Sequence, residues 1–146
     1  MKPTLCFLLL GGMAACGDDQ QPEEAAALLT RIRAESYRDW ERAPGYEVRR
    51  QADSPHSDEV DIYINPTVSL ALQAGPLPAW PRGSLIVKDG FDGDELELIA
   101  VMEKREDGWF WAEYFDDDSK YSGKPGVCID CHEDGDDFVL AFELPK

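Results

Sequence analysis

The sequence has 146 residues and a formal net charge of −16, from 30 acidic and 14 basic residues. Its hydrophobic fraction of 43% is that of a globular chain, and the length allows one domain with a substantial core. The negative charge argues against nucleic acid and anionic membrane surfaces as partners, because phosphate groups would repel the protein. A basic partner or a small neutral substrate fits this charge better.

The first fifteen residues have the layout of a secretory signal. Lys2 precedes an apolar run from Leu5 to Leu10 that is too short for a permanent membrane span. The stretch "MAAC" resembles a bacterial lipobox, so we expect residues 1–15 to be removed and Cys16 to be acylated; an ordinary signal cleaved nearby is the alternative. The protein would then lie on the periplasmic or cell-envelope side of a bacterial membrane, held by its lipid anchor only.

The expected processing leaves few cysteines for the exported domain. Cys6 leaves with the signal and Cys16 takes the lipid, so only Cys128 and Cys131 remain. Residues 16–24 are expected to form an acidic tether, because they are polar and lack apolar periodicity. Residues 25–146 are expected to form the single domain.

In chain order, the apolar spacing first predicts a helix over residues 22–40 with Pro22 in its first turn. Residues 59–65, "EVDIYIN", alternate as a strand with one buried face, and Asn65 and Pro66 then begin a short helix over 67–74 that ends at Gly75. Three prolines and two glycines make residues 75–83 a turn-rich segment.

The second half of the chain is rich in β-forming residues. The patterning predicts a strand over 84–88, a hairpin over 96–115 turning at Asp107 and Gly108, a charged loop over 116–126 and a final strand over 138–144. In the hairpin, Trp109, Trp111, Phe115 and Met102 can reach a shared apolar face. The fold class is therefore expected to be α+β, an antiparallel sheet with two or three flanking helices in a single domain.

The stretch "GVCIDCHEDG" carries the most specific motif of the chain. Cys128, Cys131 and His132 form C-x-x-C-H, the pattern of covalent c-type haem attachment. Two thiols three positions apart can add to the two vinyl groups of a porphyrin, and the adjacent histidine then binds the iron as proximal ligand. An exported chain suits this chemistry, since this haem is attached outside the bacterial cytoplasm.

Other interpretations of the cluster remain open. A structural zinc site needs four ligands, and the mature chain offers only His56 and carboxylates beyond the cluster. A thioredoxin-like pair would lie between a strand and a helix, a setting that the flanking "GV" and "HEDG" do not provide. A plain disulfide in a non-haem lipoprotein binding module is a further alternative. The acidic runs lack the ligand spacing of an EF-hand calcium loop.

The sixth iron ligand separates two kinds of function. No methionine or histidine follows His132, so a five-coordinate iron with an open face for small ligands is favoured. Met102 and His56 are the only other such residues of the mature chain. Either could complete a six-coordinate electron-transfer cytochrome, although Met102 in a strand is expected in the core and His56 in a surface loop or against a haem propionate.

The late C-x-x-C-H and the segments "DIYIN", "PRGSLIVKD", "MEKREDGWFWAEYF", "CIDCH" and "DDFVLAF" resemble the β-rich family of cytochrome P-460 and cytochrome c-prime-beta over most of the mature length. The resemblance implies a monohaem protein that acts on a small nitrogen species, hydroxylamine or nitric oxide, and it suggests a homodimer. It also implies that Lys88, at the end of "GSLIVK", lies at the haem edge and can be cross-linked to the haem; without the resemblance Lys88 would be taken as a solvated charge.

The resemblance is compatible with two kinds of chemistry, oxidation of the ligand and simple binding. The family's distal glutamate aligns near Ala100, with Glu97 and Glu103 close by, and an arginine of the enzyme aligns near Val60. A hydroxylamine-oxidising enzyme needs a carboxylate that accepts protons. Its apparent absence favours an apolar pocket that binds nitric oxide or carbon monoxide, with Ile62, Trp111 and Phe115 as wall residues.

Overall fold

The structure is a computed structural model that describes residues 20–52 and 55–146. The predicted signal over 1–15 and the lipidation of Cys16 fall outside these residues. The described helices and strands, in chain order, are α1 (Pro22–Ala34), the 3-10 helix η1 (Tyr37–Asp39), β1 (Glu41–Arg42), β2 (Arg50–Gln51), β3 (Glu59–Ile64), α2 (Pro66–Ala74), β4 (Leu85–Asp92), β5 (Glu95–Arg105), β6 (Gly108–Phe115), β7 (Asp118–Gly123) and α3 (Gly126–His132).

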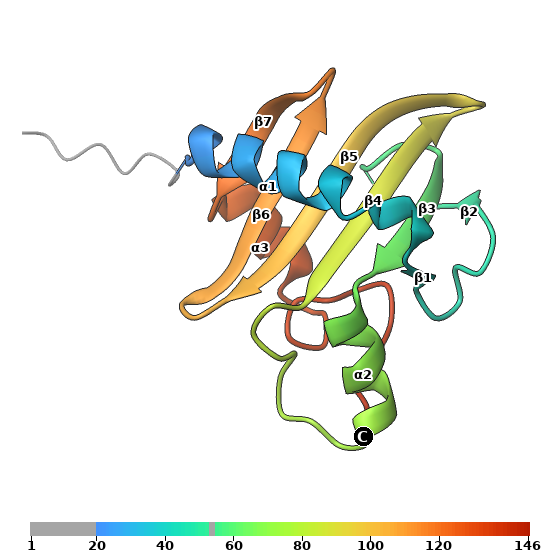
Figure 1. Cartoon of the computed structure of the whole chain (residues 1–146), viewed down its shortest axis with the longest axis vertical. Coiled ribbons are helices and arrows are strands. Elements are labelled where there is room, and N and C mark those ends of the chain that lie inside the picture. The colour runs from blue at the N-terminus through green and yellow to red at the C-terminus, as the bar shows by residue number, and fades with distance from the viewer. Residues whose placement is uncertain (1–19, 53–54) are drawn as a thin grey trace, which may run out of the picture.

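The seven strands form one antiparallel sheet in the order β1-β3-β4-β5-β6-β7, and β2 also pairs with β3. Helix α1 crosses one face of the sheet, α3 lies on the opposite face, and α2 sits at one end near the C-terminus (Figure 1). The predicted α+β class with flanking helices is confirmed. No helix within residues 20–52 and 55–146 is long and apolar enough to cross a membrane.

Two buried clusters hold these layers together. On one face, α1 packs against alternate sheet residues such as Val87, Val101 and Phe110. On the other face, residues such as Ile62 and Trp111 pack against α2, α3 and the C-terminal segment. Because successive strand residues point to opposite faces, one strand supplies both clusters.

Tight turns join the central strands. The hairpin of β5 and β6 has Glu106 and Asp107 between the paired residues Arg105 and Gly108, and Gly108 has a φ of 116°. Such a positive φ favours glycine, so the predicted hairpin is confirmed with its turn one residue earlier than expected. The Asn65 cap is also confirmed: its Oδ1 accepts from the amides of Val68 at 3.2 Å and Leu85 at 3.1 Å.

The first predicted helix is too long. Helix α1 ends at Ala34, because Ser36 adopts a left-handed conformation with a φ of 51°, and a separate 3-10 turn follows. That turn brings the Tyr37 hydroxyl and the Arg38 guanidinium to the buried carboxylate of Asp89, at 2.8 and 2.7 Å. A tertiary contact therefore ends the helix earlier than its apolar spacing predicts.

The last two predicted segments are wrong. The segment over 116–126 was expected to be a loop, but residues 118–123 of it form strand β7, which pairs with β6. The segment over 138–144 forms no strand beyond an isolated bridge between Asp136 and Val139. Instead it crosses the face that carries α3 and buries Val139, Phe142 and Leu144 there.

Candidate functional site

The helix α3 presents the thiol pair at one face of the sheet. Cys128 is half-buried and packs against the cluster that contains Trp111, whereas Cys131 is exposed. Within the described residues, neither cysteine forms a disulfide bond. Residues three apart lie on one side of a helix, so the two sulfur atoms share the side of α3 next to His132.

His132 is oriented by the loop that follows α3. Its Nδ1 lies 2.9 Å from the backbone oxygen of Phe138, and its ring makes an edge contact with Trp111 at a centroid distance of 4.8 Å. Burial lowers the pKa of His132, which favours the neutral imidazole. With Nδ1 bonded to the carbonyl, the Nε2 atom is the one left to bind a metal.

One row of side chains crosses the sheet on the same face as α3. Lys88 of β4 is paired with Ile62 of β3 and with Ala100 of β5, and Ala100 is paired in turn with Glu113 of β6. Directly paired residues of antiparallel strands project to the same face. The row therefore places an amine and a carboxylate on either side of the small Ala100.

Lys88 is a largely buried lysine in the middle of β4. The residue pattern alone, without the family resemblance, predicts a solvated charge at the end of a strand, and that prediction is wrong. Burial lowers its pKa to about 8, and the charges of Cys131 and Glu113 oppose that shift only in part. Within the described part of the chain its ammonium forms no hydrogen bond or ion pair. Lys88 therefore carries an amine that is unusually easy to deprotonate and is close to the thiol pair.

Glu113 is the residue that sequence reasoning missed. Its side chain is only 12% exposed, and it lies in the row where an apolar pocket was expected. The expectation that this face lacks a carboxylate is therefore wrong. The alternation of Trp109, Trp111 and Glu113 along β6 places the acid on the same face as the two tryptophans, and that signal was available in the sequence.

His56 joins the same cluster, so the prediction of a surface-loop histidine is wrong. Its side chain is only 17% exposed, and its Nδ1 lies 3.8 Å from Oε1 of Glu113. Its ring also stands edge-on to that of His132, with the centroids 6.3 Å apart. The loop before β3 therefore contributes a second imidazole to the site.

The predicted wall residues divide into two groups. Ile62 and Trp111 are buried on the face that carries α3. Phe115 lies half-exposed at the end of β6, where Lys120 approaches its ring. Met102 is half-buried among the aromatic residues of the same face, paired with Ile86 and Trp111.

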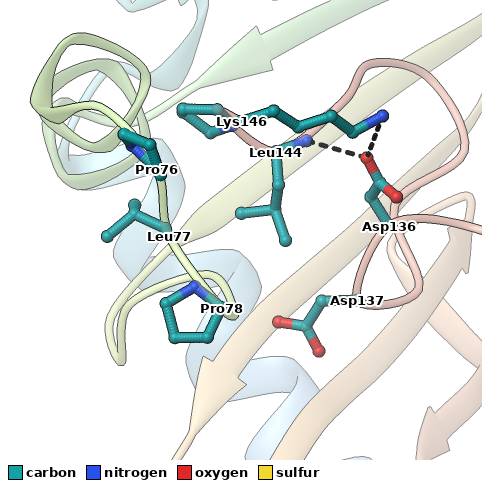
Figure 2. Close-up of a pocket in the computed structure, with 8 residues that line it drawn as sticks. Pro76, Leu77, Pro78, Asp136, Asp137, Leu144 and Lys146 are labelled. Carbon is teal, nitrogen blue, oxygen red and sulfur yellow. Dashed lines mark hydrogen bonds and ion pairs between the residues drawn. The ribbon is translucent and has the colours of Figure 1, made fainter.

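An open pocket of about 540 Å³ lies apart from this cluster (Figure 2). It is bordered by Pro76, Leu77 and Pro78 on one side and by the acidic loop and the C-terminal segment on the other. Its Asp136 carboxylate accepts from the Leu144 amide at 3.2 Å and lies 3.9 Å from the Lys146 ammonium. These contacts tie the C-terminus to the loop after α3.

The donor set of the cluster fits a covalently attached haem. Two thiols outside any disulfide, on one side of a short helix, match two vinyl groups, and the His132 imidazole can offer Nε2 to the iron because Nδ1 meets the Phe138 carbonyl. Lys88 and Glu113 face the same space from the sheet. Among the described residues, no three His, Cys, Asp or Glu side chains converge as a metal site.

No model of a protein family matches the chain, and no curated protein is similar to it in sequence.

Proposed function

We propose that this protein is an exported monohaem c-type cytochrome that resembles the cytochrome P-460 and cytochrome c-prime-beta family. Cys128 and Cys131 would hold haem c through two thioether bonds, and His132 would bind the iron through Nε2. The observation that carries the proposal is the position of α3, which brings these residues to the face where Lys88 and Glu113 share a row.

The bound haem would supply an iron centre that takes a small ligand on its open side and accepts electrons from it. The chain's own residues would then determine which ligand binds and whether it is oxidised. Glu113 is placed to accept a proton as electrons leave a bound nitrogen, which is what oxidation of hydroxylamine requires. Ile62 and Trp111 would restrict the size of the ligand and exclude water. Hydroxylamine oxidation is therefore the favoured activity, and nitric oxide is the expected alternative ligand.

The experiment that tests this proposal is an absorption spectrum of the full chain, produced in a bacterium that matures c-type cytochromes. We expect a Soret band and haem that stays with the denatured polypeptide. The double variant Cys128→Ala/Cys131→Ala should lose covalent haem, while Cys6→Ala, which lies in the predicted signal, should keep it. A wild-type protein without a Soret band would overturn the proposal.

A second function is supported by the position of His56. Its ring lies close enough to that of His132 to suggest an iron held between two imidazoles, which is typical of electron carriers. A low-spin ferric spectrum that becomes high-spin in His56→Ala would favour this function. A high-spin ferrous spectrum in the wild-type protein, with carbon monoxide binding unchanged by His56→Ala, would favour the open site. Met102→Leu tests the remaining axial candidate in the same way.

The wider setting is part of the same proposal. The predicted lipid on Cys16 would hold the protein at the periplasmic or cell-envelope side of a bacterial membrane. A basic protein is the electron-transfer partner that the net charge of −16 favours, and their encounter should weaken as salt is added. The resemblance further suggests a homodimer, which light scattering of the purified domain would test.

A further inference from the structure

The loop after α3 has an unusual backbone that carries the acceptor of the His132 hydrogen bond. Asp137 and Phe138 have φ values of 49° and 67°, in the left-handed region that side chains other than glycine disfavour. Gly135 begins the turn, and a Cβ there would lie 2.6 Å from the backbone of Val139. Two consecutive left-handed residues persist only when the surrounding structure holds them.

Asp137 is the point at which the sheet holds this loop. The Lys104 ammonium lies 2.7 and 2.8 Å from the two carboxylate oxygens, and both side chains are largely buried. The backbone amide of Trp80 donates to the same carboxylate at 2.8 Å. The indole N–H of Trp109 donates to the backbone oxygen of Asp137, also at 2.8 Å. Both the side chain and the peptide unit of Asp137 are therefore fixed.

The Asp137–Phe138 peptide unit, which these contacts fix, lies directly before the Phe138–Val139 unit, whose carbonyl meets His132. The carbonyl of Asp137 faces Trp109, and the next carbonyl, that of Phe138, faces Nδ1 of His132 at 2.9 Å. Rotation of the loop around Asp137 would turn the Phe138 carbonyl away from the imidazole. The ion pair with Lys104 opposes that rotation.

We propose that Asp137 and Lys104 are positioning residues for the proximal histidine. By holding the left-handed turn, they keep the Phe138 carbonyl on Nδ1 of His132 and so raise the electron donation of this imidazole to the iron. Outer hydrogen bonds of this kind fix the tautomer and the basicity of a ligating histidine. The inference rests on the proposed function, because it takes His132 as the iron ligand.

The neighbouring acid offers a matched control. Asp136 lies in the same loop, but its carboxylate binds the Leu144 amide and approaches Lys146 at the C-terminus (Figure 2). Its side chain does not hold the Asp137–Phe138 peptide. Asp136→Asn therefore changes the charge of the loop by the same amount as Asp137→Asn without releasing the carbonyl that meets His132.

The test compares Lys104→Met and Asp137→Asn with Asp136→Asn in the haem-loaded full chain. We expect the first two variants to lower the frequency of the iron–histidine stretch in the ferrous Raman spectrum and to raise the midpoint potential, because weaker donation stabilises ferric iron less. Asp136→Asn and the charge-conserving Lys104→Arg should stay near wild type. A purely structural role would lower stability and leave both quantities unchanged.

The inference would be overturned if Lys104→Met and Asp137→Asn fold and bind haem but keep the iron–histidine stretching frequency and the midpoint potential of the wild type. If Lys104→Met does not fold, Asp137→Asn decides alone, because its amide oxygen can still accept from Trp80. A wild-type protein without haem would overturn the proposed function instead. Nitrogen NMR of the His132 ring in that haem-free protein would then test the positioning role of Asp137 alone. Loss of the Nδ1 proton in Asp137→Asn supports that role, and identical ring spectra in the wild type and Asp137→Asn overturn it.

Discussion

Lys88 and Glu113 lie in one row of the sheet on either side of Ala100, on the face that α3 covers. The row spans three adjacent strands, and Ala100 contributes only a methyl group between the two longer side chains. A buried amine and a buried carboxylate usually pair, because each alone is costly to remove from water. In the described part of the chain, however, Lys88 makes no ion pair, and Glu113 approaches the His56 imidazole at 3.8 Å instead. The two groups are therefore not paired with each other, and Lys88 remains available to a molecule placed above Ala100.

The first prediction concerns the carboxylate of this row. If Glu113 accepts protons during the oxidation of hydroxylamine, Glu113→Gln should lower turnover by roughly 10²- to 10⁴-fold, which is the usual range for a general base. The amide has nearly the same shape, so haem content and nitric oxide binding should remain. Steady-state kinetics and ligand titration measure the two effects separately.

A matched acid serves as the control. Glu97 accepts a hydrogen bond from Ser57 at 2.8 Å, and it lies on an exposed part of β5. Glu97→Gln should therefore leave turnover within about twofold of wild type. Equal turnover in Glu113→Gln and wild type would show that this carboxylate takes no part in the reaction.

The second prediction concerns a bond between Lys88 and the haem. Because its pKa is about 8, roughly a tenth of the Lys88 side chains are neutral at pH 7 and can act as nucleophiles. Attachment of the Lys88 nitrogen to a haem carbon in place of hydrogen would release two protons and pass two electrons to an external oxidant such as a peroxide. We expect a red-shifted ferrous Soret band in the wild-type protein and a tryptic peptide that joins the segment around Lys88 to the haem peptide. Lys88→Arg should restore an ordinary c-type spectrum. An identical spectrum in Lys88→Arg would exclude the cross-link.

The third prediction concerns stability and pH in the haem-free variant Cys128→Ala/Cys131→Ala. Burial lowers the pKa of Lys88 from 10.5 to about 8, so between these values the folded chain binds fewer protons than the unfolded chain. The contribution of Lys88 to the free energy of unfolding therefore rises with pH across this window, and its full cost is present below pH 8. That cost is at most about 3 kcal/mol.

Adding Lys88→Met to this variant should remove the cost. We expect urea denaturation to show a gain of roughly 2 kcal/mol at pH 7 and a smaller gain at pH 10. Lys120 is exposed on β7, so Lys120→Met should give no comparable gain at either pH. A gain from Lys88→Met that is equal at both pH values would mean that the ammonium is not destabilised by burial.

The predictable parts of the molecule depend on local patterns. Residues 59–65 alternate strictly, and Asn65 followed by Pro66 is a strong start for a helix, so β3 and α2 fall where the sequence places them. The thiol pair and His132 are recognised by their spacing alone. Each of these features is decided by residues within a few positions of one another.

The features that sequence reasoning missed depend on contacts far along the chain. Glu113 reaches the site only because β4, β5 and β6 pair in one register, and a shift of one residue would turn it to the other face. His56 is buried by Glu113, which lies 57 positions later, at 3.8 Å. The segment over 138–144 is rich in apolar and β-forming residues, yet the left-handed residues Asp137 and Phe138 at its start direct it across the sheet face.

The fourth prediction concerns the residue that follows Lys88. Asp89 is completely buried on the opposite face of β4, where it accepts from the Tyr37 hydroxyl and the Arg38 guanidinium. Because neighbouring residues of a strand project to opposite faces, this anchor keeps Lys88 directed at the site. Asp89→Ala should cost about 1–3 kcal/mol in the free energy of unfolding, since it leaves the buried Tyr37 hydroxyl without its acceptor, whereas the half-exposed Arg38 guanidinium can bind water.

Two further variants separate this anchor from a general effect of charge. Tyr37→Phe leaves the Asp89 carboxylate with Arg38 and should cost roughly 1–2 kcal/mol. Arg82→Ala breaks an exposed pair with Glu106, whose side chains are 72% and 85% exposed, and should change stability by less than about 0.5 kcal/mol. Chemical denaturation at pH 7 measures all three. If Asp89→Ala costs no more than Arg82→Ala, the link between η1 and β4 does not stabilise the fold, and Lys88 must be oriented by its own strand alone.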